Sequence, residues 1–241
     1  MTLVSDTLTW LTDPANWTGP GAIPQRLTEH LGLSAIALAV ALVIALPAGL
    51  AIGHTRRGSA LAAVLANIGR SVPSLAVIGI VLPLTVMIDP QLGFKVYPTL
   101  VAMVVLAIPP ILVNAEAGVV GVDPDLTEAA RGTGMREVQV LAGIEIPVSL
   151  PVIVAGVRSG ATQIVATMTL GAIFGGGGLG RYLVEGIAQN DDGKIFGGVV
   201  LVAALALATE AAFARLQRAL VSPGLRAPGG DTAPVPGIAE T

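Results

Sequence analysis

Residues 31–53, LGLSAIALAVALVIALPAGLAIG, contain no charged side chain. At about 1.5 Å of rise per residue, an α-helix of this length crosses the roughly 30 Å hydrocarbon core of a bilayer. The whole chain agrees with this stretch, since 53% of its 241 residues are hydrophobic, 12% are charged and the mean hydropathy is +0.79. One soluble domain of this size has too little interior to hide so much apolar surface. We therefore predict an all-α integral membrane protein.

Further apolar stretches follow the first, and polar residues separate them. Proline has no backbone N–H to donate, so we expect kinks at Pro73 in the second stretch and at Pro109 and Pro110 in the third. We interpret residues 60–88 as one long bent span, 89–98 as a loop and 179–188 as a short helix. The sequence predicts five transmembrane helices, several of them kinked, at about residues 31–53, 60–88, 99–122, 148–174 and 195–214.

The ends of the chain differ from this central part. Residues 1–26 contain no Lys or Arg before Arg26, so they lack the basic start of a secretory signal peptide, and the first span should remain in the mature protein. We predict an external N-terminal segment at 1–26 and a transmembrane domain at 27–215. The Pro, Gly and Ala of the last residues cannot build a core, which predicts a disordered cytoplasmic tail at 216–241.

Basic residues predict which side of the membrane each end faces. If the five spans cross a bilayer, the Lys and Arg residues outside them fall into two groups, one on each side of the membrane. By the positive-inside rule, the larger group is cytoplasmic. The N-terminus is then outside a bacterial plasma membrane and the C-terminus inside. The larger group is Arg56, Arg57, Arg131, Arg136, Arg215, Arg218 and Arg226, and the smaller is Arg26, Lys95, Arg181 and Lys194.

A polar loop at residues 123–147, here called the elbow, interrupts the apolar spans on the predicted cytoplasmic side. Asp123 is a good N-cap, and Pro124 wastes no hydrogen bond at the first helical position. A short helix should begin there and end at a sharp turn near Gly134. We expect a second short helix at about 135–142, with Pro147 ending it and redirecting the chain into the fourth span. Such a rigid elbow can pass a rotation of a partner to the spans.

The elbow carries a specific spacing. Glu128-Ala129-Ala130, then Gly134, then Ile144-Glu145-Ile146-Pro147 resembles the cytoplasmic loop that permease subunits of ATP-binding-cassette (ABC) importers insert into their ATPase subunits. Ile146 stands where leucine is usual, a change of similar volume. The resemblance implies that coupling to the ATPase involves Glu128, Ala129, Ala130, Arg131, Gly134, Ile144, Ile146 and Pro147.

Other segments extend the resemblance to about residues 27–215. They are 67–76 (NIGRSVPSLA), 121–124 (GVDP), 150–158 (LPVIVAGVR) and 175–180 (GGGGLG), and they are similar to permease subunits of osmoprotectant importers for glycine betaine, carnitine and choline. The resemblance implies a type I importer fold and a second permease subunit, identical or not. It also implies two cytoplasmic ATPase subunits, which would hold ATP and Mg²⁺, and an external solute-binding protein.

Polar side chains inside the predicted spans are candidates for a solute pathway. Such groups are costly in a bilayer unless they are paired or wetted. They either line the pathway or form structural ion pairs and hydrogen bonds between helices. The candidates are Asn67, Arg70, Asn114, Arg158 and Gln163, and Glu116 and Glu210 raise the same question.

Several kinds of chemistry have no support in this chain. It has no cysteine, no phosphate-binding Gly-x-x-x-x-Gly-Lys-Ser/Thr segment, and only isolated histidines at His30 and His54. We therefore expect no enzyme activity, cofactor or metal in this chain. Its net charge of −3 gives no support for a nucleic-acid partner, whereas its apolar composition predicts contact with membrane lipid. Gly175-x-Gly177-x-x-Gly180 fits the dinucleotide fingerprint, but it follows a membrane span and not a strand. We interpret it as a flexible turn or a surface near the binding protein.

The function predicted is that of a permease subunit that moves quaternary ammonium osmoprotectants by alternating access. An ABC importer of an amino acid or an oxyanion would carry the same loop and stays open. An ion-coupled secondary transporter is the alternative from another class, and we find no convincing repeat to favour it. The chain has two Trp, two Tyr and four Phe, too few for an aromatic cage, so selectivity should reside in the binding protein. Trp10 and Trp17 precede the first span and are expected to be interfacial anchors or part of the external segment.

Overall fold

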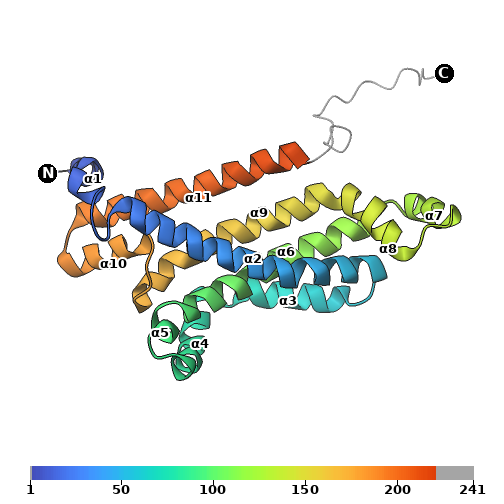
Figure 1. Cartoon of the computed structure of the whole chain (residues 1–241), viewed down its shortest axis with the longest axis horizontal. Helices are drawn as coiled ribbons and strands as arrows, with labels where there is room; N and C mark the ends of the chain where they lie inside the picture. Colours follow the sequence, from blue (N-terminus) through green and yellow to red (C-terminus); the bar gives the residue numbers. More distant parts are fainter. Residues whose placement is uncertain (1, 221–241) are drawn as a thin grey trace, which may run out of the picture.

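A computed structural model of the protein shows an elongated bundle of helices (Figure 1) and describes residues 2–220, without the side chains at positions 61, 65, 66, 68 and 70. Every regular element within this described range is helical, so the prediction of an all-α protein is confirmed. The α-helices are α1 (Leu3–Thr12), α2 (Ile23–Thr55), α3 (Ser59–Ser71), α4 (Ser74–Ile88), α5 (Leu92–Lys95), α6 (Tyr97–Val120), α7 (Pro124–Gly132), α8 (Glu137–Val140), α9 (Ile146–Gly171), α10 (Gly180–Gln189) and α11 (Asp192–Leu220). Three shorter turns complete the described chain: 3₁₀ turns at Pro14–Asn16 and Ala172–Phe174, and a π-helical turn at Leu141–Glu145.

Four helices in the described range are long and apolar enough to cross a membrane. They are α2, α6, the continuous helical stretch Glu137–Phe174 and α11. Helix α11 ends at Leu220, so the predicted start of the tail at 216 is wrong. Residues 216–220, LQRAL, are good helix formers, which explains the extension. The rest of the predicted tail, 221–241, lies outside the described residues.

The predicted second span is two helices, α3 and α4, and the interpretation of residues 60–88 as one bent helix was wrong. Pro73 lies at the break, with extended backbone at φ −62° and ψ 130°. Proline cannot donate a helical hydrogen bond, and it pushes the preceding residue out of the α region. The chain therefore leaves the helix at Val72 and does not merely bend. The predicted loop at 89–98 contains the short helix α5 and the start of α6.

Small residues let α2, α6 and α9 pack closely. Every fourth residue of α2 from position 37 to 53 is Ala or Gly, and all of these are buried. A Cβ on Gly49 would lie 2.5 Å from the carbonyl oxygen of Leu112, and one on Gly53 would lie 2.7 Å from the Cβ of Val119. Helices α6 and α9 are equally close at Gly156, whose Cβ would meet Asn114 at 2.5 Å. Such small-residue contacts are a usual way for membrane helices to associate, and here they form the core of the bundle.

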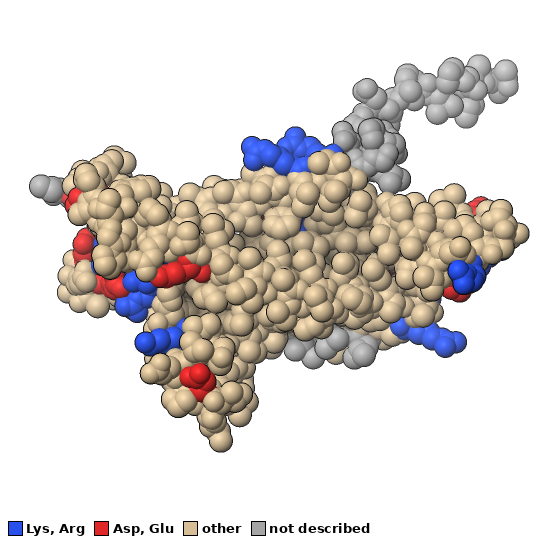
Figure 2. All heavy atoms as spheres, viewed as in Figure 1, with Lys and Arg blue, Asp and Glu red and all other residues tan. Residues whose placement is uncertain are grey.

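The elbow and the N-terminal segment lie at opposite ends of this bundle (Figure 1). Helices α7 and α8 project from one end, while α1 lies beside the start of α11 at the other end, near α10. Figure 2 shows that charged side chains gather at these two ends, apart from basic residues near the end of α11. The long middle section presents few charges, as expected for a surface that contacts hydrocarbon.

Candidate functional site

The first helix of the elbow forms as the sequence predicts. Helix α7 begins at Pro124, and Oδ1 of Asp123 accepts a hydrogen bond from the N–H of Asp125 at 3.0 Å. The cap satisfies one of the amide groups that a helix leaves without a partner at its N-terminus. This local chemistry fixes where the elbow starts.

A tight turn follows α7. Gly134 adopts φ +89°, a conformation that residues with a Cβ rarely take. Its N–H donates to the carbonyl of Arg131 at 2.9 Å, and the N–H of Met135 donates to that of Ala130 at 3.2 Å. The Arg131 guanidinium then reaches across the turn and donates two hydrogen bonds, of 2.9 and 3.0 Å, to Glu137. This charge-assisted pairing ties α7 to α8 and raises the pKa of Arg131.

The predicted coupling residues differ in exposure. Glu128, Ala129, Arg131 and Gly134 are exposed, Ile144 and Ile146 are partly buried, Pro147 is exposed, and Ala130 is buried inside the elbow. Sequence reasoning missed two apolar side chains beside them, since Leu126 is 50% exposed and Val138 is 76% exposed. Large apolar groups on a polar, protruding loop are typical of a surface that contacts another protein. The sequence could have indicated Leu126 and Val138, because they are large apolar residues within an otherwise polar loop.

The second half of the elbow differs from the prediction. Helix α8 ends at Val140, the π-helical turn Leu141–Glu145 follows, and α9 begins at Ile146 without a break. Pro147 therefore does not end a helix or redirect the chain, and that prediction was wrong. It is the second residue of α9 and directly follows the π-helical turn, so it lies inside a continuous helical stretch. The stretch from Glu137 to Phe174 is one continuous helical unit, so the elbow joins the fourth span rigidly.

His54, which the sequence presents as isolated, connects the end of α2 to the elbow. Its Nδ1 lies 2.6 Å from Oε2 of Glu145, and its Nε2 lies 3.3 Å from Oε2 of Glu137. Glu145 is only 5% exposed. No sequence pattern indicates this contact, because 91 residues separate His54 from Glu145.

A cavity of about 410 Å³ lies in the middle of the bundle. Two of the predicted pathway residues, Asn114 of α6 and Gln163 of α9, line it. The break between α3 and α4 supplies one wall, and the neighbouring prolines of α6 supply another. Prolines 109 and 110 cannot donate to the carbonyls four residues earlier, so α6 has spare hydrogen-bond acceptors here. The lining is Gly69, Val72, Ser74, Leu106, Pro109, Pro110, Val113, Asn114, Ser159 and Gln163.

A second hollow of about 600 Å³ adjoins the first, because Ser159 and Gln163 line both. Arg158 and Glu210 form an ion pair in it, between α9 and α11, and Thr162 also hydrogen-bonds to Glu210. The side chains of α9 that line the two hollows include several polar ones, which form a polar face along the middle of this helix: Arg158, Ser159, Thr162 and Gln163. Asn67 lies on α3 outside both linings, and the side chain of Arg70 lies outside the described part of the chain.

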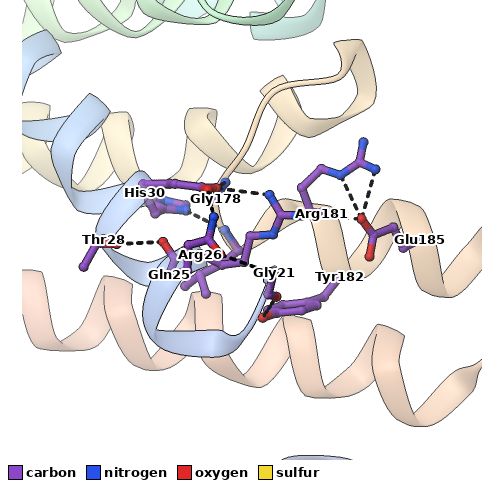
Figure 3. Close-up of polar contacts among 11 residues, drawn as sticks. Gly21, Gln25, Arg26, Thr28, His30, Gly178, Arg181, Tyr182 and Glu185 are labelled. Atoms are coloured by element: carbon purple, nitrogen blue, oxygen red, sulfur yellow. Dashed lines mark hydrogen bonds and ion pairs between the residues drawn. The ribbon is translucent and has the colours of Figure 1, made fainter. Parts of the chain in front are cut away.

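At the end opposite the elbow, α2 holds the glycine-rich loop 175–179 (Figure 3). Oε2 of Glu29 accepts a hydrogen bond from the N–H of Gly178 at 2.9 Å, and Nδ1 of the buried His30 accepts from the N–H of Leu179 at 3.3 Å. Nε2 of His30 lies 3.1 Å from the carbonyl of Val165 on α9 and donates to it when Nδ1 is the acceptor. The N–H groups of Gly178 and Leu179 already donate to Glu29 and His30, so they are not available to bind a phosphate.

The same end contains a second set of polar contacts, around α10. The hydroxyl of Tyr182 donates to the carbonyl of Gly21 at 2.8 Å, and burial raises the pKa of Tyr182 to about 12. Burial alone would raise the pKa of Glu185, but hydrogen bonds from Lys194 and Arg181 outweigh it and lower that pKa. Trp10 of α1 packs edge-on against Tyr182. The N-terminal segment is therefore part of the fold at this end.

Comparison with known proteins identifies the family of this chain. The family model described as "Binding-protein-dependent transport system inner membrane component" matches residues 41–227. The chain belongs to this family. The permease is thus a multi-pass membrane component of a transport system, and its family implies an ATP-binding partner and a substrate-binding protein.

The permease is similar in sequence to named relatives over most of their length. It is 32% identical over 209 residues to the glycine betaine/carnitine/choline transport system permease protein OpuCB of Bacillus subtilis, covering 87% of this chain and 93% of that protein. It is 31% identical over 221 residues to the osmoprotectant import permease protein OsmW of Salmonella typhimurium, covering 92% of this chain and all of OsmW. A chain of the MetNI methionine ABC transporter, solved in inward-facing conformations, shares the fold with a TM-score of 0.74 at 24% identity, covering 88% of this chain and 100% of that chain. The type I importer fold expected from the sequence is confirmed.

Proposed function

We propose that this permease moves quaternary ammonium osmoprotectants, of the glycine betaine and choline type, into a bacterial cell by ATP-driven alternating access. The proposal includes a second permease subunit, two cytoplasmic ATPase subunits that hold ATP and Mg²⁺, and an external solute-binding protein. The chain itself holds no cofactor or metal in this proposal. The N-terminus lies outside and the C-terminus in the cytoplasm.

The proposed cargo is supported by relatives that are similar to nearly the whole chain and whose names state what they transport. OpuCB and OsmW are named for transport of these solutes or for osmoprotectant import, and the similarity covers 87–92% of this chain. No aromatic side chain is among the residues that line the central cavity within the described part of the chain. Aromatic faces are the usual partners of quaternary ammonium groups, so this lining supports selection of the solute by the binding protein.

In the proposed mechanism, the ATPase engages the elbow through its exposed residues. The salt-bridged turn between α7 and α8 makes the elbow stiff, and the helical continuity from Glu137 to Phe174 joins it to α9. A rotation of the elbow would therefore turn α9, together with the α6 helix packed against it. The polar face of α9 borders both hollows, so this turn would open the pathway to one side and close it to the other.

Transport by purified complexes in proteoliposomes tests the proposal. The permease would be co-expressed with the ATPase and binding protein that co-purify with it, and ATP would be supplied on the ATPase side. We expect uptake of radiolabelled glycine betaine or choline that requires ATP and the binding protein. Methionine and molybdate serve as competing cargoes from the amino acid and oxyanion classes.

Different results would overturn different parts of the proposal. Uptake driven by a sodium or proton gradient without ATP would exclude the ABC mechanism. ATP-dependent uptake of methionine or molybdate, without uptake of glycine betaine or choline, would keep the mechanism and exclude the cargo. A labelling reagent that reaches position 128 only from outside intact cells would exclude the proposed orientation.

A further inference from the structure

Helix α2 is fastened near both of its ends by polar contacts. At the inner end, His54 holds Glu145 in the π-helical turn and Glu137 at the start of α8. At the outer end, Glu29 and His30 hold the backbone of the loop 175–179. Helix α2 is continuous between these two sets of contacts, and the 24 residues from His30 to His54 correspond to roughly 36 Å.

The inner contact is specific. Glu145 is 5% exposed, and within the described part of the chain its carboxylate has one hydrogen-bonding partner, the imidazole of His54. A buried carboxylate that loses its partner is strongly disfavoured, so this contact is expected to persist as the elbow moves. The wider π turn also changes the direction of Glu145 relative to a regular α-helix, and such turns are frequent at functional sites.

The outer contact is equally defined. Glu29 and His30 are consecutive in the sequence, and each accepts one N–H of the loop, from Gly178 and Leu179 respectively. Figure 3 shows His30 beside Gly178. His30 also lies 3.1 Å from the carbonyl of Val165, so it ties α2 to α9 at this end as well. A side chain on Gly177 would collide with the Glu29 carboxylate. The loop is thus shaped around the end of α2.

The elbow reaches the loop 175–179 by two routes. One is α9, which joins the elbow at one end and leads through residues 172–174 into the loop at the other. The other is α2, which meets the elbow at His54 and the loop at Glu29 and His30. We propose that α2 is a connecting rod, which passes displacement of the elbow to the external loop 175–179. His54 and Glu145 are its inner joint, and Glu29 with His30 is its outer joint. These residues are positioning residues, and the proposal rests on the proposed coupling role of the elbow.

Transport stoichiometry tests the rod, because a merely structural role would change the amount of active complex and not the solute moved per ATP. The variants are Glu145→Leu at the inner joint and Glu29→Leu at the outer joint, which remove the accepting oxygen, and the double variant. Arg57→Gln is the matched control, since Arg57 is exposed just beyond the end of α2. We expect each joint variant to lower glycine betaine moved per ATP by about 5-fold or more. The double variant should lose no more than the worse single variant, because both act on one element.

A covalent replacement of the inner joint provides a second test. The chain contains no cysteine, so His54→Cys with Glu145→Cys introduces the only two thiols. We expect the reduced variant to be uncoupled, and a short bifunctional thiol crosslinker to restore glycine betaine moved per ATP. Restoration supports a mechanical joint, since the crosslink shares no charge or hydrogen bond with the native pair.

Failure of the rod is distinguishable from failure of the proposed function. If the unsubstituted complex shows no ATP-driven uptake, the proposed function is overturned. If the unsubstituted complex transports and Glu145→Leu and Glu29→Leu keep the normal stoichiometry, only the rod is overturned. Losses that add in the double variant, or a crosslinked pair that stays uncoupled, would also overturn the rod.

Discussion

The turn of the elbow offers a matched pair of glycines that differ in one property. A Cβ on Gly132 or on Gly134 would meet nothing within 4 Å, so neither substitution creates a collision. Gly134 has φ +89°, whereas Gly132 is the last residue of α7 and has no positive φ. Alanine at a left-handed position costs about 1–2 kcal/mol, and alanine in place of a helical glycine gains roughly 0.5–1 kcal/mol. Gly134→Ala should therefore weaken the turn, and Gly132→Ala should leave it intact or strengthen it.

Hydrogen–deuterium exchange of the purified permease measures this difference locally. The reporters are the amides of Thr133, Gly134 and Met135, which bond to the carbonyls of Ala129, Arg131 and Ala130 at 2.9–3.2 Å. Opening the turn releases the strain at position 134, so the open population rises by the same free energy. A strain of about 1–2 kcal/mol corresponds to exchange that is about 5–30-fold faster in Gly134→Ala.

The control decides whether the reasoning holds. Gly132→Ala should show unchanged or slower exchange at these amides, and both variants should keep native exchange in α6 and α9. Equal acceleration in the two variants would mean that crowding, and not backbone conformation, governs the turn. No acceleration in Gly134→Ala would refute the assigned conformation of the elbow.

Three further predictions concern the bundle. Gly156→Ala should lower Tm by several degrees through overpacking of about 1–3 kcal/mol against α6, whereas Gly32→Ala, where a Cβ meets nothing within 4 Å, should not; equal Tm values would contradict this packing. Arg158→Leu should destabilise the permease more than the double variant with Glu210→Leu, because the single change leaves a carboxylate unpaired beside the bilayer; thermal unfolding of the two variants compares them. Since burial raises the pKa of Tyr182 to about 12, from about 10 when unfolded, its contribution to stability is complete below pH 10 and is lost as the pH rises towards 12. Tyr182→Phe should remove this alkaline loss, and an unchanged pH profile of unfolding would refute it.

The elbow shows how far sequence reasoning extends. The cap at Asp123 and the start of α7 at Pro124 follow from contacts within two residues, and the structure has both where they were predicted. The prediction for Pro147 failed because proline has two outcomes. It often ends a helix, but a helix can also continue through it where the regular hydrogen-bond pattern is already interrupted, as in the π-helical turn before Pro147.

The cavity shows the same limit on a larger scale. Asn114 and Gln163 were candidates because polar groups are rare in membrane spans, but Arg158 was an equally good candidate and pairs with Glu210. Nothing in the sequence shows that Asn114 faces the central cavity whereas Arg158 faces the second hollow. That distinction depends on how each helix is rotated about its axis.

The apolar stretches, the cap at Asp123 and the coupling spacing could be read from the sequence, because each depends on residues that are close together in the chain. The joints at the two ends of α2 could not. His54 meets Glu145 across 91 residues, and Glu29 meets Gly178 across 149. Such contacts exist only after the alanine and glycine face of α2 has set its depth and rotation against α6, since packing of the whole bundle brings these side chains within hydrogen-bonding distance.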